Sequence, residues 1–130
     1  MNTSAQVQAN QSHSRAVVWI DHLMAKVFSM GLTGVTPSAV HAHLSSPHLH
    51  HKANSIGAGR VEDDPTFLEQ VGNAVASCRE VLILGPGVEK TALLHYLQTV
   101  YPRMALRLES CDHPTDPEII AVGRKHFRLD

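Results

Sequence analysis

The sequence predicts an α/β protein with a mixed five-stranded sheet, helices on its faces and the element order β-β-β-α-β-α-β-α. Three observations lead to this prediction. An apolar run at 81–84 is followed by a Gly-Pro-Gly break and then by leucines at helical spacing. Two apolar, β-branched segments lie close together before residue 31. Two further amphipathic helical stripes lie at 64–78 and 116–127, each with a proline near its start.

The segment 81–84, Val-Leu-Ile-Leu, is the expected centre of the fold. It is too short for a buried helix and Gly85 follows at once, so a fully buried strand is expected. Pro102 is expected to end the helix that follows. The apolar residues that recur at helical spacing there are Leu93, Leu94, Leu97, Val100 and Tyr101. Strand, tight turn and helix make half of a βαβ unit and the expected core.

The three strands before this unit are expected to form an antiparallel meander. Residues 16–20 and 25–30 predict two strands, and 21–24 is a weak turn signal because it contains no glycine. Two glycines and a proline at 31–37 predict the next turn. Residues 38–44 predict a third strand, which is poorer in apolar residues and is therefore expected at a sheet edge.

Two more helices and a fifth strand complete the order. Asp64 is the expected cap of the first helix, with Pro65 in its first turn. Residues 104–108 predict the fifth strand, and Asp116 and Pro117 are the expected cap and first residue of the last helix. The expected apolar faces are Phe67, Leu68, Val71, Val75 and Cys78 on the first helix and Ile119, Ile120, Gly123 and Phe127 on the last. By fold-level analogy, this order matches a ribonuclease-H-like sheet.

The composition fits one domain, expected at 15–130 after a loose polar arm at 1–14. The formal net charge of -1 means that nucleic-acid binding would need a local basic patch. Cys78 and Cys111 are expected to be free thiols in a reducing compartment. No run approaches the ~18 apolar residues of a membrane span, and the N-terminus lacks a signal peptide's apolar core, so no membrane association and a cytoplasmic location are expected.

The segment 45–63 shows no periodicity, and a loop of this length is usually functional or disordered. Its basic residues and glycines are candidates for contact with phosphate or RNA. These candidates are His48, His50, His51, Lys52, Gly57, Gly59 and Arg60. The alternative is a solvated loop.

The histidines of this region, with His41 and His43 on one face of a strand, also suit zinc, nickel or copper. Their HxH and HxHH tracts lack the longer spacings of zinc sites, and no cysteine lies near. No metal and no other cofactor are therefore expected, and a metal-binding protein or metal-dependent hydrolase remains the alternative.

The Gly-Pro-Gly turn is a candidate anion site. Gly85 and Gly87 allow close backbone approach, the N-terminus of the following helix favours negative charge, and Lys90 lies nearby. GPGVEKT lacks the four-residue gap of a Walker A loop. The alternative is a tight strand-to-helix turn with a solvated lysine.

A nuclease is the competing enzyme hypothesis, since two-metal catalysis needs several converging carboxylates. The sequence offers Asp21 after the first strand and Glu109 and Asp112 at the end of the fifth, while the fourth strand ends in glycine. No nucleophile lies on a glycine elbow. A non-catalytic protein is therefore favoured.

Four stretches together carry a family resemblance: VVWIDHLMAKVF at 17–28, HLHHK at 48–52, LILGPGVEKTALLHYL at 82–97 and DHPTD at 112–116. They resemble the bacterial release-factor-like family often called translational machinery proteins. That family is related to the middle domain of archaeal and eukaryotic class-1 peptide release factors and of Pelota. The resemblance spans roughly residues 15–128 and implies a non-catalytic translation role with a ribosome or RNA partner.

The same resemblance argues against peptide release. In release factors, the loop between the third strand and the first helix carries a Gly-Gly-Gln motif whose glutamine promotes ester hydrolysis on the ribosome. Here the loop reads Ser-Ile-Gly-Ala-Gly-Arg at 55–60, and the nearest glutamine, Gln70, lies in a predicted helix. Pelota-type domains also lack the motif and act on stalled ribosomes, so a translation role does not require it.

Overall fold

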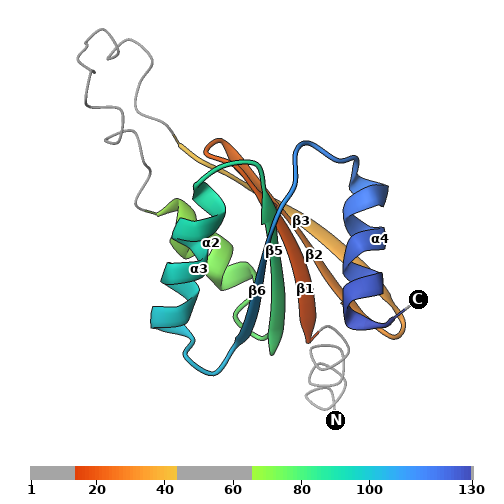
Figure 1. Ribbon diagram of the computed structural model, residues 1–130. Helices are drawn as coiled ribbons and strands as arrows, with labels where there is room; N and C mark the ends of the chain where they lie inside the picture. The colour runs from red at the N-terminus through yellow and green to blue at the C-terminus, as the bar shows by residue number, and fades with distance from the viewer. Residues whose placement is uncertain (1–13, 44–65, 130) are drawn as a thin grey trace, which may run out of the picture.

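The computed structural model describes residues 14–43 and 66–129 (Figure 1). The strands and helices follow the predicted order. They are β1 (Arg15–Ile20), β2 (Met24–Gly31), β3 (Gly34–His41), α2 (Phe67–Ala74), β5 (Glu80–Gly85), α3 (Glu89–Val100), β6 (Ala105–Ser110) and α4 (Asp116–Phe127). No helix in these two ranges is long and apolar enough to cross a membrane. Apart from Ser14, the predicted arm at 1–14 lies outside the described residues.

The sheet has the predicted mixed character. Its strand order is β3-β2-β1-β5-β6. The pairs β3–β2 and β2–β1 are antiparallel, and β1–β5 and β5–β6 are parallel. Val18 at the middle of β1 lies opposite Val27 of β2 and Ile83 of β5, so β1 joins the antiparallel meander to the parallel half.

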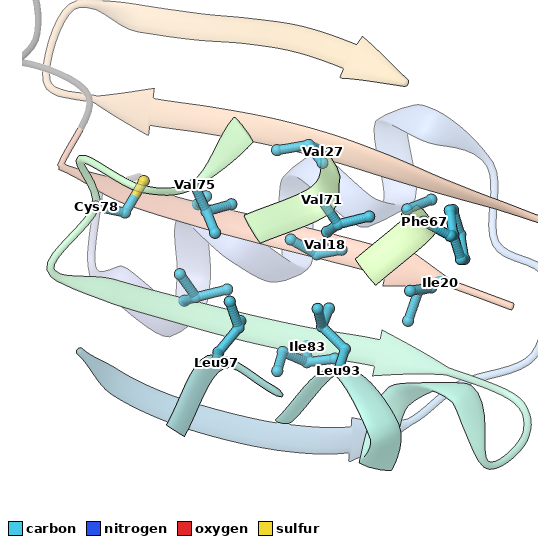
Figure 2. Packing of buried hydrophobic residues seen from close by; sticks show 13 residues of the cluster. Val18, Ile20, Val27, Phe67, Val71, Val75, Cys78, Ile83, Leu93 and Leu97 are labelled. Carbon is cyan, nitrogen blue, oxygen red and sulfur yellow. The ribbon is translucent and has the colours of Figure 1, made fainter. Parts of the chain in front are cut away.

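Helices cover both faces of the sheet (Figure 1). On one face, Val18 and Ile83 pack with Val71 of α2 and Leu93 of α3 in the larger core cluster (Figure 2). On the other face, Ile119 and other residues of α4 pack on the alternate residues of β1 and β5. Because both of their faces are covered, β1 and β5 are continuous apolar runs, as the sequence indicated.

The third strand begins earlier than predicted. Gly34 already pairs with Gly31, so the turn expected at 31–37 is reduced to the two residues between them. Pro37 lies inside β3, opposite Phe28. A proline removes one N–H group, which an edge strand tolerates. The predicted edge position of this strand is confirmed, and the same position explains why the turn prediction was wrong.

The helix ends also differ from the predictions. Helix α2 ends at Ala74, yet Cys78 beyond it is only 7% exposed and still packs in the core. The predicted cap Asp64 lies outside the described residues, and Thr66 precedes the helix. In α3, Val100 was expected on the buried face but is exposed.

Helix α4 is capped by Thr115 and not by Asp116, which is its first helical residue. The hydroxyl oxygen of Thr115 accepts from the backbone N–H of Glu118, and the carboxylate of Glu118 accepts from the N–H of Thr115. This capping box satisfies two N–H groups at once, which a cap at Asp116 would not. The predicted buried stripe is confirmed for Ile119, Gly123 and Phe127.

Candidate functional site

Gly85 and Gly87, which the sequence placed together in one candidate anion site, have different surroundings. A Cβ atom on Gly85 would overlap with the backbone oxygen of Ile20 at the end of β1. A Cβ atom on Gly87 would meet nothing within 4 Å, and Gly87 is exposed. Among the described residues, no glycine has a positive φ. Gly85 is therefore required by the close approach of β5 to β1, whereas Gly87 leaves open space beside the turn.

Lys90 folds back onto the turn. Its Nζ donates to the backbone oxygen of Gly87 at 2.6 Å. The first turn of α3 has no side-chain cap, and the N–H groups of Thr91 and Ala92 both donate to the oxygen of Val88. One N–H bond of the ammonium group is thus used within the turn, and two remain for an anion. Glu89 beside it places a negative charge at the same point, which weakens any anion site there.

The carboxyl end of β1 is closed by a side chain. Asp21 Oδ1 accepts from the N–H groups of Leu23 and Met24 at 2.8 Å and 2.9 Å. An aspartate that bonds the backbone two and three residues on can form a turn without glycine. This bonding explains why the β1–β2 turn carried a weak sequence signal, and it gives Asp21 a structural role in place of the catalytic one considered for a nuclease.

The DHPTD segment is anchored on β1 and β2. The indole N–H of Trp19 donates to the backbone oxygen of Asp112 at 2.8 Å, and the rings of Trp19 and His113 lie 5.1 Å apart. Lys26 of β2 forms an ion pair with Asp116 at 2.8 Å. The sequence indicated this segment through the resemblance, through Asp116 and Pro117 as the expected start of the last helix, and through Asp112 as a candidate carboxylate. Its partners Trp19 and Lys26 lie far away in the sequence and could not be assigned from spacing.

A cavity of about 160 Å³ lies beside this segment. It is lined by Trp19, Asp21, Met24, Lys26, His113 and Pro114. Its volume is below the roughly 300–1,000 Å³ of small-molecule pockets, and its polar groups are engaged with one another. Asp21 Oδ2 lies 3.9 Å from His113 Nε2, and Lys26 is paired with Asp116. These contacts hold the DHPTD segment against β1 and β2 and so support the fold.

The predicted histidine site is described only in part. His41 and His43 are exposed at the end of β3. The other predicted site residues, His48, His50, His51, Lys52, Gly57, Gly59 and Arg60, lie outside the described residues. Within 14–43 and 66–129, no three His, Cys, Asp or Glu residues are grouped so that they could hold a metal ion. Asp21, Glu109 and Asp112, considered for two-metal catalysis, form no such group.

The two cysteines are free. Burial raises the pKa of the Cys78 thiol to about 11. The pKa of Cys111 is also raised, first by burial and then by the charges of Asp112, Glu118 and Glu109. Both thiols are therefore protonated at neutral pH, and neither has the lowered pKa of a nucleophilic cysteine.

No protein-family model matches the sequence, and no curated protein matches it. Solved structures do match it. Pelota from Archaeoglobus fulgidus aligns with a TM-score of 0.60 at 14% identity, over 98% of this chain and 36% of that one. The archaeal translation termination factor aRF1 aligns with a TM-score of 0.62 at 9% identity, over 98% and 38%. Dom34 of S. cerevisiae, a translation termination-like factor involved in RNA quality control, aligns with a TM-score of 0.54 at 11% identity, over 92% and 35%.

The chain spans little more than a third of the length of these proteins. At such low identity, the similarity establishes the fold. The resemblance inferred from the sequence is therefore confirmed at the level of fold: the chain shares its mixed five-stranded sheet and helices with a part of Pelota and aRF1.

Proposed function

We propose that the protein acts in translation as a non-catalytic, cytoplasmic, ribosome-binding domain that contacts RNA. The supporting observation is that nearly the whole chain aligns with about a third of Pelota, aRF1 and Dom34. Two of these are described as factors of translation termination or as termination-like. Because the match covers nearly the whole chain and two of the three structures are described in this way, a translation role is better supported than an enzymatic one.

In this proposal, the loop between β3 and α2 makes the first contact. Its imidazole, ammonium and guanidinium groups suit phosphate, and its glycines let the backbone approach closely. The contacting residues are His48, His50, His51, Lys52, Gly57, Gly59 and Arg60. Gly85, Gly87 and Lys90 form a second, weaker anion contact at the end of β5, because Gly87 is open to solvent and Lys90 keeps two free donors.

The test is co-sedimentation with ribosomes at fixed salt, at pH 7.5 and at pH 6. Unperturbed imidazoles gain charge near pH ~6.5, so binding should strengthen as the pH falls and weaken as salt is added. A variant with His48, His50 and His51 replaced by alanine should lose most of this pH response. The control replaces His22 and His95, two exposed histidines outside this segment, with alanine. Its pH response should be like that of the wild type. Absence of the wild type from the ribosome pellet at both pH values would overturn the proposal.

A second measurement separates this role from peptide release. The loop offers Gly57, Ala58, Gly59 and Arg60 where release factors carry Gly-Gly-Gln. We therefore expect no hydrolysis of peptidyl-tRNA on programmed ribosomes above the level without protein. Ester cleavage at the rate of a release factor would replace the non-catalytic role with an enzymatic one.

A further inference from the structure

Six basic residues gather at one end of the molecule. Arg79 precedes β5, Arg103 precedes β6, and Arg107 lies within β6. The backbone joins the first two strand starts directly, since the N–H of Ala105 donates to the oxygen of Arg79 at 2.8 Å. The remaining three are Arg124, Lys125 and Arg128. We call these six residues the basic end.

The carboxyl end of helix α4 lies at the same end of the molecule, with Arg124 and Lys125 in its last turn and Arg128 directly after it. Its first residue, Asp116, is paired with Lys26 near the start of β2. Its last residue, Phe127, lies beside Val81 and Ala105 at the amino ends of β5 and β6. Helix α4 therefore runs antiparallel to β5 and β6, and its carboxyl end lies beside their amino ends, at the lower end in Figure 1.

Two hollows mark this surface. One, of about 330 Å³, is lined by Glu80, Val81, Ala105, Leu106, Arg107, His126 and Phe127. The other, of about 300 Å³, is lined by Ser14, Arg15, Arg79, Glu80 and Ala105. They share Glu80 and Ala105, so they adjoin across the amino ends of β5 and β6. The result is a concave surface with arginines on either side.

Within 14–43 and 66–129, these positive charges have no carboxylate partner. Among the described residues, none of the six basic-end residues is in an ion pair, and five are exposed while Arg124 is half-buried. The nearby carboxylate of Glu80 is already paired with Arg15 at 3.1 Å. Like charges held together oppose the compact state, so an unpartnered cluster suits a negative partner from outside the molecule.

The opposite end carries the opposite charge. Six carboxylates lie at or beyond the carboxyl ends of β1, β5 and β6: Asp21, Glu89, Glu109, Asp112, Asp116 and Glu118. A net charge of -1 therefore conceals a strong separation of charge along the strands. Such a field turns a polyanion toward one end during approach.

Helix dipoles explain part of this pattern. Cations near a helix carboxyl end gain about 0.3–1 kcal/mol each, and α4 carries Arg124, Lys125 and His126 in its last turn. Arg107 lies on a strand and not in the last turn of a helix. It faces the same hollow as His126. The convergence of strand and helix residues on one hollow is what indicates a ligand.

We propose that the basic end binds the phosphate backbone of RNA by contacts that do not depend on base sequence. Arginine suits this role because its planar group donates two parallel hydrogen bonds to a phosphate. The proposal rests on the ribosome-binding function above and adds a third contact surface, at the end of the sheet opposite the Gly-Pro-Gly turn.

The test variant replaces Arg103, Arg107 and Lys125 with alanine; all three are exposed and, within 14–43 and 66–129, form no side-chain hydrogen bond or ion pair. The probe is a fluorescent RNA hairpin of about 20 base pairs at pH 7.5, titrated at several salt concentrations. Each lost phosphate contact reduces the slope of log affinity against log salt by roughly 0.7–0.9. We expect the slope to fall by about 2 and the affinity at low salt to fall at least about tenfold.

Two matched controls isolate the surface. In the first control, glutamate replaces His22, Ser38 and Gln70, which are exposed and away from the basic end. This variant has the same net charge as the alanine variant, and its affinity should change little. Replacing Arg103 and Arg107 with lysine keeps the charge and should keep most of the affinity. An equal loss in the glutamate control would show a general effect of net charge and overturn the proposal.

A measurement on the wild type removes any dependence on folding of the variant. RNA should protect Lys125 from acetylation and leave Lys26, at the opposite end, as reactive as before. Equal reactivity of Lys125 with and without RNA would overturn the proposal. So would binding to phosphatidylserine vesicles without binding to RNA.

Ribosome co-sedimentation separates this inference from the function it rests on. If the wild type and the alanine variant pellet equally with ribosomes and bind the hairpin equally, the basic end is excluded and the translation role stands. If the wild type binds the hairpin through the basic end but never pellets with ribosomes, the RNA surface stands and the ribosome proposal falls.

Discussion

The two ends of the sheet differ in how their polar groups are used. At the carboxyl ends of the parallel strands, Asp21 bonds the β1–β2 turn, Trp19 holds Asp112, and Thr115 caps α4. At the amino ends, most of the basic side chains are exposed, Arg124 is half-buried, and among the described residues only Arg15 is in an ion pair, with Glu80. Polar groups at the carboxyl ends form hydrogen bonds within the protein, whereas the basic side chains at the amino ends mostly face solvent.

This difference separates stability from binding. Changes at the carboxyl ends should lower the free energy of unfolding, because each removes an internal contact. Changes at the basic end should leave unfolding nearly unaltered and alter affinity for polyanions. The motifs that stood out in the sequence, Gly-Pro-Gly and DHPTD, lie at the end built mainly for stability.

The largest expected effect is at Gly85. An added methyl group in Gly85→Ala would overlap with the backbone oxygen of Ile20, which cannot move without shifting β1. We expect a loss of about 3 kcal/mol in the free energy of unfolding, measured by urea denaturation. The control Gly87→Ala meets nothing within 4 Å and has no positive φ to strain. Its stability should change by less than about 0.5 kcal/mol; equal losses in both variants would remove the distinction between the two glycines.

Cys78 tests whether the charge of the basic end reaches the core. It precedes Arg79 in the chain, and a guanidinium near the thiol would lower its pKa. Burial instead raises the pKa of Cys78 from 9.0 to about 11. Between these values the unfolded thiol loses its proton while the folded one keeps it. Stability is therefore fully present below pH 9 and falls as the pH rises toward 11.

The expected loss across that pH window is about 2 kcal/mol. The measurement is urea unfolding at intervals from pH 8.5 to pH 11. Other groups titrate in the same range, so the wild type is compared with Cys78→Ala, whose curve should be flatter by that amount. Parallel curves for the two proteins would mean that the thiol ionises in the folded state as easily as in the unfolded one.

The cap of α4 gives a smaller effect at the carboxyl ends. Thr115→Ala removes the hydroxyl that accepts from the N–H of Glu118, while the backbone N–H at position 115 can still donate to the Glu118 carboxylate. The expected loss is about 1 kcal/mol. Thr99→Ala is the matched control, because Thr99 is exposed and its hydroxyl donates to the backbone oxygen of His95 within helix α3. If both variants lost the same free energy of unfolding, the loss would reflect the removal of any threonine hydroxyl and not the capping box.

Much of the fold could be predicted because both faces of β1 and β5 are covered. Burial on both faces requires apolar residues throughout 16–20 and 81–84. The helices pack one face on the sheet, so each shows an apolar stripe. Features that depend on a neighbour could not be predicted. Pro37 reads as a turn signal until β3 is known to be the edge strand. Thr115 becomes the cap only because Glu118 reaches back to it.

The candidate site was likewise predictable where its residues are contiguous in the sequence, and not where they depend on a neighbour in space. The Gly-Pro-Gly turn is contiguous, so the sequence identified it, but the constraint on Gly85 comes from Ile20 on another strand. The six residues of the basic end are spread over the sequence from 79 to 128, and acidic residues elsewhere balance their charge to a net -1. The basic end becomes visible only when the starts of β5 and β6 and the end of α4 are placed side by side.

The smallest expected effect is at Lys90. This residue lies at the carboxyl end of β5 and also belongs to the proposed anion contact. Lys90→Ala removes one exposed hydrogen bond to Gly87 and replaces lysine with a good helix former. The free energy of unfolding should therefore change by less than about 0.5 kcal/mol. If the turn binds phosphate, affinity for the RNA hairpin should fall about two- to threefold, and the salt slope should fall by about 0.7.

The matched control for Lys90 is Lys26→Ala, which removes the same charge at the same end. Lys26 is already paired with Asp116, so its loss should affect RNA binding less than the loss of Lys90. Both variants are measured beside the alanine variant of the basic end, which should lose far more affinity. Equal binding by the Lys26 and Lys90 variants would leave the Gly-Pro-Gly turn as a purely structural connection, and RNA contact at the described residues would then rest on the basic end alone.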